Sequence, residues 1–243
     1  MRACVISDIH GNLHALDAVL AAVADEAPDE IWCLGDLVGY GPRPNACCRV
    51  VERDAAFSLV GNHDLGIIGK IDLDGFSDDA AESARWTQSV LDPEPRAFLE
   101  RLEPKGEREG VGLYHASPVD PVWEYVMSPE AAAAAIVTAP ERIVLVGHSH
   151  LALAFVLADG RLAGGLAPDG TELDLEAADR WLLNPGSVGQ PRDGDPRAAF
   201  LVLDLDAGRA TYRRVSYPLE ATQQELRDRG LPEALATRLE VCL

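Results

Sequence analysis

The sequence lacks long hydrophobic runs and has little positive charge. No apolar stretch among its 243 residues reaches the length of a membrane-spanning helix, and no signal-like segment precedes the first apolar run at residues 3–6. The 40 Asp and Glu residues outnumber the 21 Lys and Arg residues, which gives a formal net charge of −19. Since nucleic-acid-binding proteins usually present a basic surface, this balance disfavours a nucleic-acid partner. We expect a cytoplasmic protein that does not bind membranes.

Cysteine is scarce and is not spaced for metal or redox chemistry. Among the five cysteines, Cys4 and Cys33 fall inside apolar runs, and Cys47 and Cys48 are adjacent in a helical pattern. We expect reduced cysteines that serve as packing residues. The sequence also lacks internal repeats, low-complexity tracts and flexible linkers. With 47% hydrophobic residues, it is predicted to form one domain over residues 1–243.

Five short apolar runs are each followed directly by polar residues. The runs are residues 3–6, 31–34, 57–60, 111–114 and 143–146, and they are predicted to form buried strands separated by helices. The polar motifs that follow them are Asp8-Ile9-His10, Gly35-Asp36, Gly61-Asn62-His63-Asp64, His115 and Gly147-His148-Ser149-His150. Because α/β sheets place their sites at the carboxyl ends of the strands, we expect these motifs to converge in space.

The converging side chains point to a pair of metal ions. The carboxylates of Asp8 and Asp36, one amide and five imidazoles are too many donors for one tetrahedral site, and they suit a two-metal centre better. Nitrogen and oxygen donors without thiolate suit Mn, Fe, Zn, Co or Ni. A carboxylate would bridge two cations about 3.5–4 Å apart, the spacing used for in-line displacement at phosphorus.

In this order, the motifs resemble those of the calcineurin-like metallophosphoesterase superfamily, and Asn184-Pro185-Gly186-Ser187 resembles a motif of its bacterial phosphodiesterase-like branch. The resemblance implies two divalent metal ions, with manganese favoured, and a catalytic His63 that assists the leaving oxygen. Asp64 is expected either to orient His63 or to stabilise its turn. The implied ligands are Asp8, His10, Asp36 and His150 for one ion, and Asp36, Asn62, His115 and His148 for the other.

The sequence departs from the pattern of the Ser/Thr protein phosphatases and of the symmetrical dinucleoside tetraphosphatases. Those families carry a phosphate-clamping Arg shortly after the Gly-Asp motif, where this sequence has Tyr40, and Val60 stands where a second Arg is expected. A diester carries less charge than a monoester, so the missing clamp favours a diester. Tyr40, Arg43 and Arg192 are candidate substrate contacts, since Arg binds phosphate bidentately. Trp123 and Trp86 are candidates for an aromatic pocket.

The sequence therefore predicts a dinuclear metal-dependent phosphoesterase. We expect a metal-bridging hydroxide to hydrolyse a small or nucleotide-like phosphodiester. The alternatives are a nucleoside-polyphosphate or phosphoprotein phosphatase, or a non-catalytic binding module on the same fold. The expected partner is a small phosphorylated substrate, and an oligomer is compatible with the sequence.

The predicted fold is a four-layer α/β/β/α sandwich of two mixed sheets flanked by helices. Helices are expected over residues 12–27, 44–53, 78–91, 93–102 and 129–139, and two more over 218–243. Residues 65–110 lack strand alternation and are predicted to form a helical cap over the site. Strands at 153–158, 181–183, 198–205 and 211–216 are expected to form the second sheet.

Overall fold

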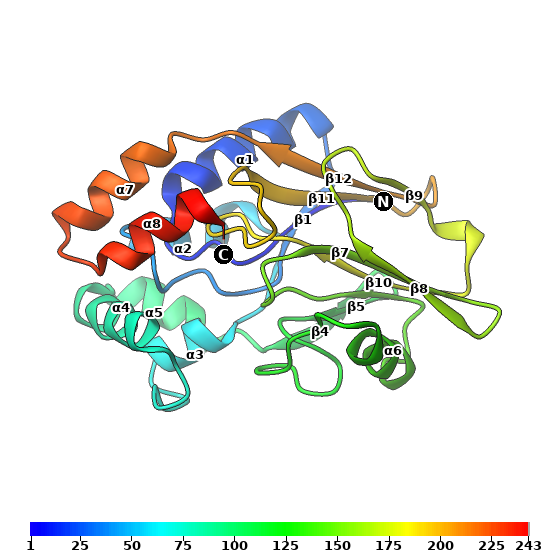
Figure 1. The fold of residues 1–243 in the computed structure, drawn as a ribbon, viewed down its shortest axis with the longest axis horizontal. Coiled ribbons are helices and arrows are strands. Elements are labelled where there is room, and N and C mark those ends of the chain that lie inside the picture. The colour runs from blue at the N-terminus through cyan, green and yellow to red at the C-terminus, as the bar shows by residue number, and fades with distance from the viewer. Residues whose placement is uncertain (243) are drawn as a thin grey trace.

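The computed structural model describes residues 1–242 and shows two six-stranded mixed sheets packed face to face (Figure 1). The first sheet has the order β3 (Phe57–Ser58), β2 (Glu30–Cys33), β1 (Arg2–Ile6), β11 (Ala198–Asp204), β12 (Arg209–Val215) and β9 (Glu172–Asp174). The second has the order β4 (Lys105–Arg108), β5 (Val111–Tyr114), β6 (Ile143–Leu145), β10 (Arg180–Pro185), β7 (Ala152–Ala158) and β8 (Arg161–Leu166). Strands β1, β2 and β3 run parallel, as do β5, β6 and β10.

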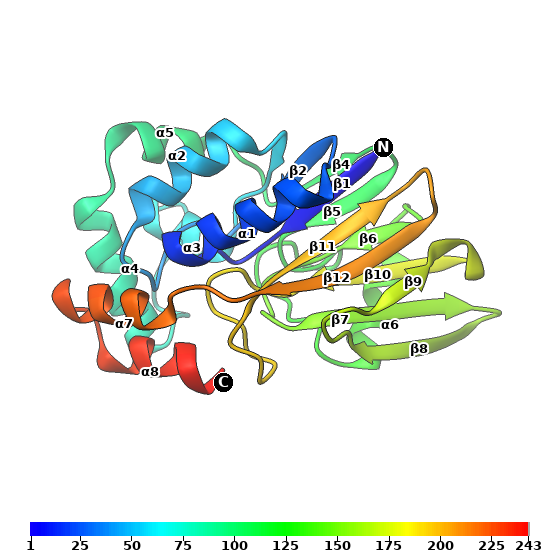
Figure 2. The same cartoon turned by 90° about the horizontal axis from the view of Figure 1, so that it is seen from above.

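Helices cover the outer faces of both sheets. Helices α1 (Leu13–Glu26) and α2 (Pro44–Asp54) pack on the first sheet, and α6 (Pro129–Thr138) packs on the second. The remaining helices gather at one end of the sandwich, as Figures 1 and 2 both show. They are α3 (Asn62–Ile67), α4 (Asp78–Val90), α5 (Pro93–Glu100), α7 (Leu219–Asp228) and α8 (Glu233–Val241). A short 3₁₀ helix, Leu175–Ala177, precedes β10. The four-layer sandwich is therefore confirmed.

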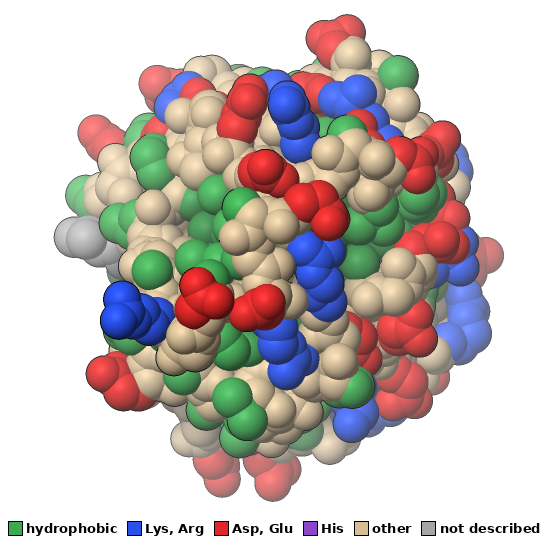
Figure 3. Space-filling model, turned by 90° about the vertical axis from the view of Figure 1, so that its right-hand side faces the viewer, with side chains coloured by type: hydrophobic (Ala, Val, Ile, Leu, Met, Phe, Trp, Pro, Cys, Tyr) green, Lys and Arg blue, Asp and Glu red, His purple; other side chains and the backbone are tan. Residues whose placement is uncertain are grey.

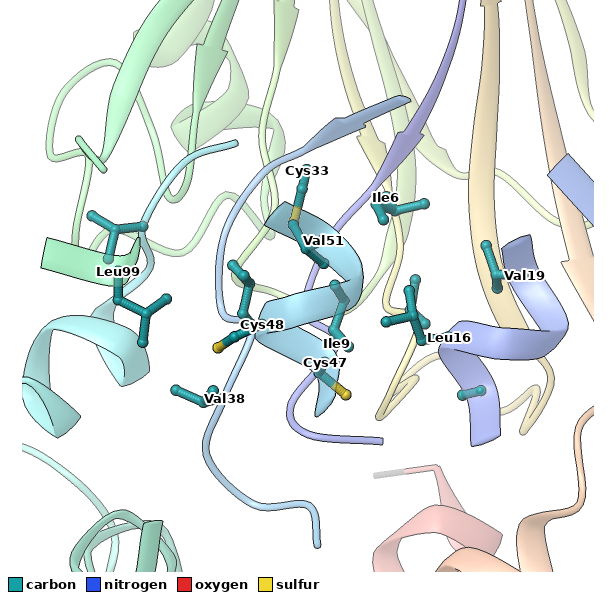
Figure 4. Close-up of a cluster of buried hydrophobic side chains, with 14 of the residues drawn as sticks. Ile6, Ile9, Leu16, Val19, Cys33, Val38, Cys47, Cys48, Val51 and Leu99 are labelled. Carbon is teal, nitrogen blue, oxygen red and sulfur yellow. The ribbon is translucent and has the colours of Figure 1, made fainter. Parts of the chain in front are cut away.

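Three apolar layers hold the sandwich together. Between the sheets, Trp32 and Leu34 from the first sheet pack in one cluster with Leu113 and Leu145 from the second. Each such fully buried large side chain contributes about 1.5–3 kcal/mol. The second layer lies under α1 and α2, where Cys47, Cys48 and Val51 of α2 lie beside Cys33, Ile6 and Ile9 (Figure 4). The third lies under α6. All five cysteines are free and buried, as expected.

The predicted helices form close to their expected bounds. The side chain of Asn12 caps α1 by accepting a hydrogen bond from the Ala15 amide at 3.2 Å. Ser128 caps α6 in the same way, with Pro129 at the first helical position. The C-terminal residues form two helices, α7 and α8, separated at residues 229–232.

Two predictions about strands were wrong. The predicted strands at 198–205 and 211–216, which are β11 and β12, belong to the first sheet, and the second sheet instead takes up β5 and β6. The apolar residues of β11 are buried on both faces of the sheet, as is typical of a central strand, and β11 pairs with β1 in the middle of the first sheet. In addition, residues 65–110 end in a strand, β4, which pairs with β5 through a turn at Glu109 and Gly110. As a polar edge strand, β4 shows no apolar alternation.

The surface carries charges of both signs. On the face in Figure 3, acidic side chains are interspersed with arginine and lysine side chains. No helix within residues 1–242 is both long and apolar enough to cross a membrane. The cytoplasmic location stays a prediction.

Candidate metal centre

The polar motifs meet at one end of the sandwich, where strands from both sheets end. Backbone hydrogen bonds join the loops: the Asp8 amide donates to the Gly35 carbonyl at 3.0 Å, and the His10 amide donates to the Asp36 carbonyl at 2.9 Å. The loop after β6 joins the loop after β5 in the same way, through Gly147 and the carbonyl of His115 at 2.8 Å. The predicted convergence of segments far apart in sequence is confirmed.

The backbone is strained at the positions that present the polar side chains. A left-handed conformation is uncommon for residues other than glycine and costs about 1–3 kcal/mol each. It occurs at Asp8 (φ 54°), His10 (49°), Asp36 (53°), Tyr40 (57°), His148 (63°) and His150 (59°). Such strain persists only where the surrounding structure enforces it, and it gathers at functional sites.

The side chains form two donor sets that share one carboxylate. Within each set, the potential ligand atoms lie within 4.8 Å of one another, and every residue is buried. One set is Asp8, His10, Asp36 and His150, and the other is Asp36, His115 and His148. Asn62 joins the second set, because its Oδ1 lies 3.3 Å from Nε2 of His115. The structure thus brings together all seven predicted ligands.

Hydrogen bonds aim three of the imidazoles at the cluster. In each imidazole, Nδ1 lies against a backbone carbonyl oxygen, which can only accept a hydrogen bond. Nδ1 therefore carries the hydrogen, and Nε2 presents a lone pair. The three pairs are His10 with Val38 (3.1 Å), His115 with Leu34 (2.9 Å) and His150 with Gln190 (2.7 Å). The Nε2 atoms of His10 and His150 consequently face each other at 3.0 Å as two acceptors.

Burial sets the charge state of these groups in the protein without bound cations. Burial raises the pKa of Asp8 to about 7 and raises the pKa of Asp36 well above its usual value. It lowers the pKa of His148 to about 2 and of His10 and His150 well below their usual values. Neutral imidazoles are the form that binds metal ions.

Two buried polar atoms of the cluster have no hydrogen-bond partner within residues 1–242 and are suited to bind cations. Oδ2 of Asp36 and Nε2 of His148 have no hydrogen-bond partner among the described residues. An unsatisfied buried group costs about 1–3 kcal/mol, and more when it is charged. The donor set therefore fits two divalent cations, which would satisfy these atoms and favour ionised carboxylates.

The Asn184-Pro185-Gly186-Ser187 segment forms hydrogen bonds with two of the loops that carry the cluster. The side chain of Asn184 donates to the Gly147 carbonyl at 2.8 Å and to the Ser149 hydroxyl at 3.0 Å. The hydroxyl of Ser187 donates to the Asp8 carbonyl at 2.8 Å. The segment at the end of β10 thus fixes both Asp8 and the loop that carries His148 and His150.

Asp64 does not orient His63. Its carboxylate accepts hydrogen bonds from the amides of Leu37 (3.2 Å), Val38 (3.0 Å) and Gly61 (3.0 Å). Nδ1 of His63 is buried and has no partner within residues 1–242. The geometry favours the alternative role for Asp64, which is to stabilise the turn, because backbone amides already occupy its oxygens.

A cavity of about 350 Å³ opens beside His63 and Asn62. Two of the predicted substrate contacts, Tyr40 and Arg192, line it, and Nη2 of Arg192 lies 3.5 Å from the Tyr40 hydroxyl. The third, Arg43, does not, because its guanidinium pairs with Glu225 of α7 (Nε to Oε2, 2.6 Å). It lines a separate cavity together with Trp86. The expectation for Arg43 depended on its closeness in sequence to Asp36 and could not foresee a partner 182 residues away.

The cavity also contains residues that the sequence did not indicate. These residues are Phe76, Tyr125 and Arg238. They line the cavity together with Trp123, which was a candidate for an aromatic pocket. Phe76 sits between two small residues in the segment before α4, and Arg238 lies on α8, near the end of the chain. Neither belongs to a motif, so only the fold brings them to the site.

Comparisons with known proteins agree with this geometry. Residues 1–208 match the family model described as the calcineurin-like phosphoesterase superfamily domain. An uncharacterized protein of Methanocaldococcus jannaschii is 37% identical over 97% of this chain and 96% of its own length. The symmetrical bis(5'-nucleosyl)-tetraphosphatase of Vibrio cholerae serotype O1 is 29% identical over 60% of this chain and 56% of its own length.

Solved structures show the same fold over the whole chain. The crystal structure of a metallophosphoesterase from Sphaerobacter thermophilus superposes with a TM-score of 0.90 at 40% identity, covering 100% of this chain and 99% of the other. A hypothetical protein from Pyrococcus horikoshii OT3 superposes with a TM-score of 0.82 at 18% identity, covering 98% and 97%. The sequence match, the sandwich and the buried Asp/His cluster agree: the chain belongs to the calcineurin-like phosphoesterase superfamily and is a phosphoric ester hydrolase.

Proposed function

We propose that this protein hydrolyses phosphodiester bonds in small or nucleotide-like substrates with the help of two divalent transition-metal ions. One observation carries the proposal: Asp36 belongs to both buried donor sets. Many enzymes that displace groups at phosphorus use two metal ions held close together, and a shared carboxylate provides that spacing.

The seven donors divide between two ions. Nitrogen and oxygen ligands without thiolate suit Mn, Fe, Zn, Co or Ni, and we favour Mn. When bound, such a pair supplies Lewis-acid chemistry at the phosphoryl group and makes water more acidic. The first ion would be held by Asp8, His10, Asp36 and His150, and the second by Asp36, Asn62, His115 and His148.

Two further side chains act on the substrate. Arg192 faces the cluster without a carboxylate partner among residues 1–242, so its guanidinium is available to a phosphoryl oxygen. His63 lines the same cavity, and its amide donates to Oδ1 of Asp36 at 2.9 Å. Burial, and then the charge of Arg192, lower the pKa of His63 to about 3. The imidazole is thus neutral in the free protein, and it must take up a proton in the substrate complex to assist the leaving oxygen.

The charges around the cavity favour a diester over a monoester. Tyr40 is buried beside His63, with ring centroids 4.4 Å apart, and it fills the place of a clamping arginine with a neutral group. Val60 is also buried and apolar. A phosphodiester carries one negative charge at its reacting phosphate, which Arg192 and the metal ions match. A monoester dianion needs more positive charge.

The test compares two aryl substrates on protein loaded with each metal in turn. We expect kcat/KM for bis(p-nitrophenyl) phosphate to exceed that for p-nitrophenyl phosphate. Arg192→Gln should lower kcat/KM for both substrates. A clear preference of the wild-type protein for the monoester would contradict diester hydrolysis.

A second candidate is the hydrolysis of a nucleoside polyphosphate. The presence of a second guanidinium in the cavity, that of Arg238, favours it, because polyphosphates carry more negative charge. The similarity to proteins named as symmetrical bis(5'-nucleosyl)-tetraphosphatases also supports it. Turnover of a symmetrical dinucleoside tetraphosphate at a kcat/KM well above that of the aryl diester would favour this candidate.

A further inference from the structure

The cavity beside the metal centre has an aromatic wall. Phe76 contacts the His63 ring edge to face (centroids 4.9 Å apart) and the Trp123 ring in the same manner (5.7 Å). Tyr125 stacks on His148, with centroids 4.0 Å apart and planes inclined by 25°. These rings come from two segments, the approach to α4 and the loop after His115. The wall therefore extends from the metal ligands outward.

The aromatic wall is only partly covered by protein. Trp123 is 39% exposed and Tyr125 is 46% exposed, and Val119 and Met127 of the same loop are more exposed still, at 51% and 58%. Of these residues, Trp123 and Tyr125 line the cavity, and their exposed rings leave apolar surface in water that a ligand can cover. The flat faces of Trp and Tyr suit a planar ring. Stacking of a nucleobase on such a side chain contributes about 1–3 kcal/mol to binding.

Two arginines that lack carboxylate partners among residues 1–242, Arg192 and Arg238, also line the cavity. Many other arginines in this acidic chain pair with carboxylates, as Arg43 does with Glu225 and Arg197 with Asp195. Arg192 instead contacts Tyr40 and Gln190, and its buried Nε has no partner. The Arg238 guanidinium forms no hydrogen bond or ion pair with the described residues, although it lines the same cavity as Tyr40. Burial raises the pKa of the Tyr40 hydroxyl, and the charges of Arg192 and Arg238 oppose this rise.

Arg238 comes from a part of the chain outside the family match. The match ends at residue 208, and α8 begins at Glu233. The apolar side of α8 packs against Tyr40 and Ala80 through Leu235, Ala236 and Leu239. This packing fixes the helix beside the cavity, so that Arg238 lines the cavity together with Phe76 and Trp123. The C-terminal helices thus add a cation that the shared domain does not supply.

We propose that this cavity binds a small nucleotide diester that carries a second phosphate, with the base against Phe76 and Trp123 and the second phosphate at Arg238. The inference extends the proposed function, because it names the substrate class of the same site. A cavity of about 350 Å³ is within the range of small-ligand sites. Arg192 remains for the reacting phosphate, so the two arginines serve different phosphates.

Calorimetric titration of the metal-loaded full chain tests the two contacts by binding affinity. The probes are ribose 5-phosphate, AMP and the inert α,β-methylene analogue of ADP. We expect AMP to bind about tenfold more tightly than ribose 5-phosphate, and the ADP analogue about tenfold more tightly than AMP. Trp123→Ala should remove the first difference and Arg238→Gln the second. Arg238→Lys should retain part of the second.

The matched control is Arg229→Gln, which removes the same charge from the same C-terminal region. Arg229 lines the separate cavity beside Trp86, so the preference for the ADP analogue should remain. Equal affinities for AMP and ribose 5-phosphate would overturn the base contact. An unchanged preference in Arg238→Gln would overturn the phosphate contact. If wild-type protein hydrolyses bis(p-nitrophenyl) phosphate but does not discriminate among the probes, only this inference fails. Discrimination without hydrolysis would refute the proposed function instead.

Discussion

The Nε2 atoms of His10 and His150 lie 3.0 Å apart, and neither carries a proton that could join them. Their Nδ1 atoms hold the hydrogens, since each faces a backbone carbonyl, of Val38 and of Gln190. Burial keeps both imidazoles neutral by lowering their pKa values. Two lone pairs at this distance repel each other unless a cation accepts both. The loops hold them together nevertheless, which indicates that the site is built for a metal ion.

The first prediction is that each chain binds two metal ions. Asp36→Asn should weaken both sites, because this carboxylate belongs to both donor sets, whereas His150→Ala should empty only one. The measurement is metal content after reconstitution, by mass spectrometry. His14→Ala is the matched control, since this imidazole lies outside the cluster and contacts Glu225 at 3.1 Å, and it should retain both ions. One ion or none in the wild-type protein would refute the dinuclear centre.

The second prediction concerns stability, and it depends on the buried side chain of Asn12. This side chain caps α1, donates to the Gly189 carbonyl at 2.9 Å and accepts from the Thr222 hydroxyl at 3.0 Å. Asn12→Ala loses the cap and leaves buried partners unsatisfied, so the free energy of unfolding should fall by about 2–4 kcal/mol. Thr222→Val removes one of these contacts and should cost about 1 kcal/mol. Urea unfolding of the metal-loaded protein measures both, and equal losses would show that the cap contributes little.

The third prediction concerns the cysteines. Burial raises the pKa of Cys4 to about 12 and raises the pKa values of Cys33, Cys47 and Cys48 as well. These thiols are therefore protonated at pH 8 and should not react with a disulfide reagent such as Ellman's reagent in the folded protein. In guanidinium chloride, all five cysteines should react. Rapid reaction of the native protein would indicate an exposed thiol and contradict the packing role.

The sequence predicted the metal cluster well because its members lie at strand ends. The end of a buried apolar run can be read from the sequence, and parallel strands bring their carboxyl ends to one edge, so Asp8 and Asp36 could be placed together. His115 follows β5 of the second sheet, and the packing of the two sheets brings it to them. Which sheet a strand joins could not be read in this way. The run in β11 is apolar on both faces, which indicates a central strand but does not select its neighbours.

The substrate cavity was much harder to predict than the cluster. Arg238 and Phe76 reach it from helices and loops whose positions depend on packing, such as that of α8 on Tyr40. The ion pair that holds Arg43 away from the cavity also depends on helix packing, because its partner Glu225 lies on α7. Side chains at strand ends follow from periodicity, whereas side chains on surrounding helices follow only from the tertiary fold.

The last prediction concerns His63, which lines the substrate cavity but belongs to neither of the two donor sets. Its importance should depend on how much help the leaving group needs. An alkoxide, as in a ribose ester, requires a proton in the transition state, whereas nitrophenolate departs largely unaided. General acid catalysis is worth about 10²–10⁴-fold. His63→Ala should therefore lower kcat by about that factor on a dinucleotide and much less on bis(p-nitrophenyl) phosphate.

Metal content separates this role from the alternatives. If His63 assists the leaving group, His63→Ala should retain both metal ions, and its loss of activity should follow the pKa of the leaving group across a series of aryl and alkyl diesters. The control His14→Ala removes an imidazole outside the cavity and should show no such dependence. Equal losses on all diesters would mean that His63 only shapes the cavity next to Tyr40 and Phe76. Loss of an ion would make it a ligand, because an acid that does not touch the metals can be removed without disturbing them.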